Sequence, residues 1–234
     1  MLKKKILSVV MAAALAVGIA AVPAAAAEDE KEFLFTWNDY SACVSGLGQN
    51  NADMVYNSFA NLNSDNLGCS EINAMTTTTK TALLEDLQNS SYWVLLRYSA
   101  WELDFQTSLL ALNGASQNLQ DMLLFSEIEA LPDNALSHVK LVILAANGSA
   151  EGGAQADNLA TLLKSKGVQN VIGFESEIAD FTNRYVFSST IPVCLSQGMD
   201  VEESITFTID LIEEMNGQFG LDAQMLRDSV VLVQ

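Results

Sequence analysis

Residues 139–153 read VKLVILAANGSAEGG, and this stretch decides the fold. Its first eight residues are almost all apolar, as in a strand buried on both faces of a parallel sheet. A glycine-rich turn follows, and residues 157–166 have the pattern of an amphipathic helix. After Gly167, residues 168–174 read VQNVIGF and predict a second buried strand. This strand, turn, helix and strand form a βαβ unit, which indicates an α/β protein.

The rest of the chain also alternates between strand-like and helix-like segments. We predict strands or extended segments at 33–37, 66–75, 92–98, 101–124 and 229–233, and helices at 51–62, 80–88, 178–196 and 201–215. Capping boxes predict helix starts at Ser126–Glu129 and Asp200–Glu203. The alternation predicts a mostly parallel sheet with helices on both faces, in which the strand around 141–145 lies beside the strand around 93–98.

Residues 1–27 are typical of a cleaved signal peptide. Lys3 to Lys5 are followed by an apolar run at 6–22 and by the small residues of a cleavage site at 23–27. We therefore expect a secreted bacterial protein whose mature chain, 28–234, is a single domain without membrane insertion. A retained N-terminal anchor is the alternative.

The chain is strongly acidic. Cleavage would remove three lysines and no acidic residue, so the formal net charge would change from −18 to −21. This charge argues against nucleic acid and anionic membranes as partners. Of the three cysteines, Cys43 and Cys69 either form a disulfide or remain buried thiols. Cys194 lies in an apolar run and is predicted to be a core residue.

Three further segments carry a family resemblance. Residues 122–128 read MLLFSEI, residues 166–174 read KGVQNVIGF, and residues 196–205 read SQGMDVEESI. In this order, with the strand at 141–144, they resemble the C-terminal half of CHAT domains, relatives of caspases and clostripain. The resemblance implies a caspase-like three-layer α/β fold with a mostly parallel central sheet of about six strands and helices on both faces.

The resemblance also implies where a Cys–His dyad would lie. Aligned on the strands, Asn147 takes the place of the nucleophilic cysteine, and Ser99 and Ala100 take the place of the histidine and its glycine. An amide forms no nucleophile, and a serine is no base near neutral pH. We therefore expect a pseudoenzyme without catalytic residues, in which Ser99, Ala100, Asn147, Gly148 and Ser149 line a degenerate cleft.

Other candidates for chemistry have simpler explanations. His138 precedes the strand at 139 and so lies at the wrong end to serve Asn147, and no neighbour in sequence would activate Ser149. The turn at 148–153 matches no nucleotide-binding pattern, and the oxygen-rich stretch 61–66 lacks the glycine and glutamate of a calcium loop. We expect no cofactor and no metal.

Three functions stay open at this point. The first is an exported, inactive domain that binds a protein or peptide. The second is an active cysteine-peptidase-like hydrolase with relocated catalytic residues. The third is an extracellular structural module. An open cleft at the ends of the strands around Leu95 and Ile143 would favour binding, and a cleft filled by side chains would favour a structural role. The partner and the oligomeric state do not follow from the sequence.

Overall fold

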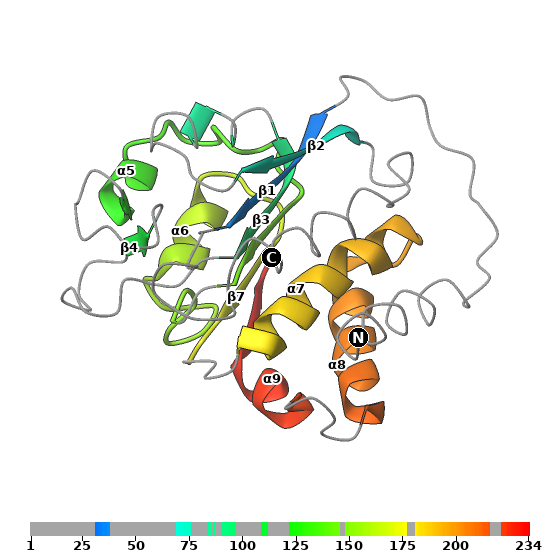
Figure 1. The fold of residues 1–234 in the computed structure, drawn as a ribbon. Helices are drawn as coiled ribbons and strands as arrows, with labels where there is room; N and C mark the ends of the chain where they lie inside the picture. The colour runs from blue at the N-terminus through cyan, green and yellow to red at the C-terminus, as the bar shows by residue number, and fades with distance from the viewer. Residues whose placement is uncertain are drawn as a thin grey trace, which may run out of the picture.

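The computed structural model describes residues 31–37, 69–75, 84, 85, 87, 90–96, 109–111, 122–145, 148–176, 181–215 and 221–234 (Figure 1). Side-chain burial is described for 84, 85, 87, 125–145, 148–176, 186–215 and 221–234. The predicted signal peptide, Cys43 and the predicted helix at 51–62 lie outside the described residues.

Backbone pairing places six strands in the order β2-β1-β3-β6-β7-β8. Their bounds are β2 Cys69–Met75, β1 Lys31–Trp37, β3 Ser90–Leu96, β6 Leu141–Leu144, β7 Val171–Phe174 and β8 Val230–Val233. The pairs from β2 to β7 are parallel, whereas β7 and β8 are antiparallel. A separate antiparallel pair joins β4, Leu109–Ala111, to β5, Met122–Leu124. The predicted contact between β3 and β6 is confirmed, with Trp93 opposite Val142.

The predicted fold class needs correction. We expected a caspase-like three-layer fold around a mostly parallel sheet of about six strands. Where side chains are described, the sheet is small and mixed: β6 and β7 are parallel, β8 is antiparallel, and five helices accompany these three strands. The direction of β8 has a local cause. The Glu175 N–H donates to the Ser229 carbonyl at 2.7 Å, so the chain enters β8 beside the carboxyl end of β7 and must run back along it.

The helices in this part are α5 Phe125–Glu129, α6 Leu159–Ser165, α7 Phe181–Ser196, α8 Val201–Glu214 and α9 Ala223–Ser229. The predicted cap of α8 is confirmed, because the Glu203 N–H donates to the Asp200 side chain and the Asp200 N–H donates to Glu203. The predicted cap of α5 is wrong, because the helix already begins at Phe125, before Ser126. Within the described residues, no helix combines the length and apolar character needed to cross a membrane.

Alternate residues of β6 and β7 face two separate cores, as the two-residue period of a strand requires. On one face Leu141, Ile143 and Phe174 pack against α7, α8 and α9, where Phe187 meets Phe174 edge to face at 5.7 Å between ring centroids. On the other face Val142 and Leu144 pack against α5 and α6. Figure 1 shows α6 on one side of the sheet and α7 and α8 on the other.

Candidate functional site

The structure describes only part of the predicted cleft. Ser99, Ala100 and Asn147 lie outside the described residues, so their placement stays a prediction. Gly148 and Ser149 lie in the turn that follows β6, beside the carboxyl end of β7. Gly148 is partly exposed with φ +63°, and Ser149 is buried.

The hydroxyl of Ser149 bridges the ends of two neighbouring strands. Its Oγ donates to the Leu144 carbonyl at 3.0 Å and accepts from the Phe174 N–H at 3.1 Å. The side chain is 5% exposed, so these bonds form away from water. A nucleophilic serine must lose its proton to a base, whereas this hydroxyl donates its hydrogen bond to a backbone carbonyl, which cannot act as a base. Ser149 therefore has a structural role: its hydroxyl links the carboxyl ends of β6 and β7 and acts as a clamp between them.

The turn also fits closely against β7. Ala150 is fully buried, and its N–H donates to the Phe174 carbonyl at 3.0 Å. A Cβ at Gly173 would lie 2.8 Å from the Ala150 Cβ and 3.2 Å from the Ser149 Oγ. Only a residue without a side chain permits this approach. At this point β7 and the turn leave no room for a further side chain.

Asn158, which the sequence reading passed over, closes the turn. Its Nδ2 donates to the carbonyls of Glu151 and Gly153, and its Oδ1 accepts from the Thr161 N–H. The Asn158 N–H in turn donates to the Thr161 hydroxyl. An asparagine followed by a threonine three positions later is a capping-box signal that could have identified the helix start. Because Asn158 already occupies the Thr161 N–H, it takes a donor that an anion would need.

The thiol of Cys194 lies in α7 and is 1% exposed. Burial raises the pKa of this thiol to about 11, and a hydrogen bond with the Thr208 side chain offsets part of the rise. The thiolate is the reactive form of cysteine, and at neutral pH this thiol is protonated. The prediction that Cys194 is a core residue is confirmed.

His138 is half-buried in the turn before β6, at the opposite end of that strand from the Ser149 turn. A base at this position does not serve Ser149. Within the described ranges, no cluster of three histidine, cysteine or acidic side chains has an arrangement suited to a metal ion.

No family model matches the chain, and no curated protein matches it. The resemblance to CHAT domains therefore stays a prediction from the sequence segments that carry it.

Proposed function

We propose that the protein is an exported, non-catalytic module that binds a protein or peptide partner. The non-catalytic part is carried by one observation: the Ser149 hydroxyl, the hydroxyl closest in sequence to Asn147, is held by two hydrogen bonds to the backbone. The buried thiol of Cys194, whose pKa is raised to about 11, supports the same conclusion. The binding part rests on the sequence. The chain keeps the segment order of a peptide-handling family, while its dyad positions read Asn147 and Ser99.

A structural module is the second candidate, and a specific observation favours it. The turn at 148–150 lies directly against β7, because a Cβ at Gly173 would meet Ala150 and the Ala150 N–H donates to the Phe174 carbonyl. Binding requires an exposed surface that a partner can reach, whereas a purely structural role requires none. The two candidates differ in whether the folded protein retains a partner from solution.

A digest of a broad peptide library, read by mass spectrometry beside an unfolded control, tests the non-catalytic part. We expect no cleavage by the folded protein. Cleavage that disappears with Ser149→Ala or Cys194→Ala would contradict the proposal and favour the relocated hydrolase.

Affinity capture tests the binding part. The folded protein is immobilised in the culture medium of the producing cells, and each retained protein is purified and titrated back. We expect at least one saturable partner that the unfolded protein does not retain. If no retained protein binds saturably on re-titration, the structural module becomes the better conclusion.

A further inference from the structure

The direction of the backbone groups along β8 follows from one hydrogen bond. The Glu175 N–H donates to the Ser229 carbonyl, so the backbone groups of Ser229 face β7. In an antiparallel pair this direction alternates from residue to residue. Val231 and Val233, which pair with Gly173 and Val171, therefore also face β7. The groups of Val230, Leu232 and Gln234 face away from it.

The outward backbone groups of β8 differ in whether they have a partner among the described residues. The Val230 N–H is used, because it donates to the Leu226 carbonyl of α9. Four other outward groups have no hydrogen-bond partner among the described residues: the Val230 carbonyl, the Leu232 N–H and carbonyl, and the Gln234 N–H. β8 is also the last strand in the sheet order of the described strands.

The residues of β8 include none of the types that discourage pairing at a sheet edge. Its residues are Val-Val-Leu-Val, without a charge, a proline or a glycine. Natural edge strands use lysine, proline or a bulge to prevent another strand from pairing. Val230, Val231 and Leu232 are partly exposed, and they pack against the two cores. The edge is therefore already ordered by packing before a further strand pairs with it.

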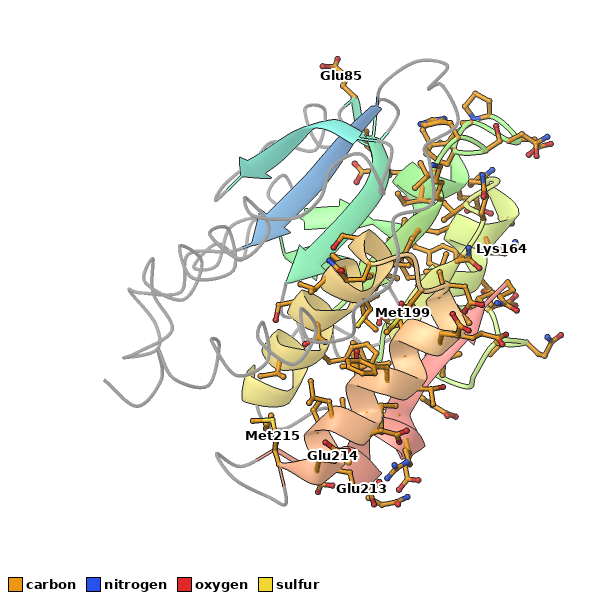
Figure 2. All side chains as sticks on the ribbon, turned by 90° about the vertical axis from the view of Figure 1, so that its right-hand side faces the viewer. Glu85, Lys164, Met199, Glu213, Glu214 and Met215 are labelled. Atoms are coloured by element: carbon orange, nitrogen blue, oxygen red, sulfur yellow. The ribbon has the colours of Figure 1, made fainter. Side chains whose placement is uncertain are left out.

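The charge beside this edge indicates the kind of strand that fits. Asp228 and Glu175 are exposed at the end where the chain enters β8. The nearest cation in sequence, Arg227, is occupied by Asp210 at 3.1 Å and by Glu213 of α8. Figure 2 shows Glu213 at the α9 end of α8 and Lys164 well away from it. With a net charge of −18, the chain attracts cations over a distance.

We propose that the outer edge of β8 binds an extended, positively charged segment of a partner protein by strand addition. The proposal rests on the proposed function as a binding module and names its surface and partner class. The backbone of the partner would pair with Leu232, the Val230 carbonyl and the Gln234 N–H. Its lysine or arginine side chains would lie near Asp228 and Glu175.

Two synthetic peptides test the proposal. Both are capped heptapeptides, one of alternating lysine and threonine and the other of alternating glutamate and threonine. We expect the lysine peptide to bind the purified protein at least ten-fold more tightly. Leu232→Pro removes an outward N–H that would bond to the peptide, so it should weaken that binding at least ten-fold. The variant should still fold, because proline is tolerated where the N–H of an edge strand faces solvent. Equal affinity for the two peptides would overturn the proposal.

A matched pair of double variants separates local charge from total charge. Glu175→Lys with Asp228→Lys and Glu129→Lys with Glu202→Lys change the net charge equally, and all four side chains are exposed. The first double variant should weaken binding of the lysine peptide at least three-fold more than the second double variant does. Equal losses would show that only the net charge matters and would contradict a site at β8.

Amide hydrogen exchange measured in the unmodified protein tests the same site without any substitution, so the result does not depend on whether a variant folds. The lysine peptide should slow exchange at Leu232 and Gln234 at least ten-fold and leave Val231 and Val233 unchanged. A concentration-dependent dimer that protects the same amides would make a second copy the occupant and overturn the proposal. If a captured partner binds Leu232→Pro as tightly as the unmodified protein, the edge site fails while the binding module stands.

Discussion

The two sides of β7 differ in how completely their polar groups are used. On one side, the polar groups of the turn after β6 form hydrogen bonds within the protein: the Ser149 hydroxyl, the Ala150 N–H and the Asn158 side-chain amide. On the other side, β8 leaves the outward groups of Leu232 without partners in the described structure. The turn after β6 is thus closely packed against β7, whereas the outer edge of β8, to which sequence reasoning assigned no role, keeps backbone groups without partners among the described residues.

The strongest way to break this contrast is to force the closed turn away from β7. Gly173→Ala puts a Cβ 2.8 Å from the Ala150 Cβ and 3.3 Å from the Ala150 nitrogen, and neither atom can rotate away. We expect a loss of about 3 kcal/mol in the free energy of unfolding, at the upper end for overpacking. Urea denaturation followed by circular dichroism measures it.

Gly153→Ala is the matched control for this substitution. Gly153 has φ +82° and nothing within 4 Å of an added Cβ. Its substitution should cost only the backbone strain, about 1 kcal/mol. Equal losses for the two variants would mean that the turn is not closely packed.

The second test removes the clamp without adding bulk. Ser149→Ala leaves the buried Phe174 N–H and the Leu144 carbonyl without their bonds to the hydroxyl. We expect a loss of about 2 kcal/mol, typical of buried groups left unsatisfied. Ser165→Ala serves as the control, because the Ser165 hydroxyl donates to the Leu162 carbonyl in an exposed position. A loss at Ser149 no larger than at Ser165 would contradict the clamp.

The third test asks whether the interior stays closed as pH rises. Burial raises the pKa of Cys194 from 9.0 to about 11, so between these values the folded protein holds a proton that the unfolded chain has released. Stability is therefore unaffected below pH 9 and falls as pH rises towards 11, by about 1 kcal/mol at pH 10. The difference between the unmodified protein and Cys194→Ala, measured by denaturation at pH 7 to 10.5, isolates this effect from other groups. A difference that does not change with pH would show an ordinary thiol pKa.

Sequence reasoning reached the parts of the fold that local patterns encode. The buried strands at β6 and β7, the neighbouring β3 and the cap at Asp200 follow from apolar runs and capping residues. Helix α9 was missed, because it has only seven residues and gains contacts from outside its own sequence, such as those of Arg227 with Asp210 and Glu213.

The details of the site depend on contacts between segments distant in sequence. The role of Ser149 depends on Phe174, 25 residues away, which no local pattern shows. The strand character of β8 was readable from its apolar run, but its antiparallel direction and edge position come from the order of the whole sheet.

The last test concerns the outer edge of β8 and needs no substitution. If the direction of the backbone groups along β8 alternates as the bond from Glu175 to Ser229 implies, amide exchange should alternate as well. Val231 and Val233, paired with β7, should exchange only through opening of the strand, whereas Leu232 and Gln234 should exchange at least ten-fold faster. Exchange followed by two-dimensional NMR at pH 7 measures all four amides in one sample. Slow exchange at Leu232 with fast exchange at Val231 would reverse the assignment of the two sides. Equal protection at all four would mean that another part of the chain already pairs with this edge, which would remove the contrast between the two sides of β7.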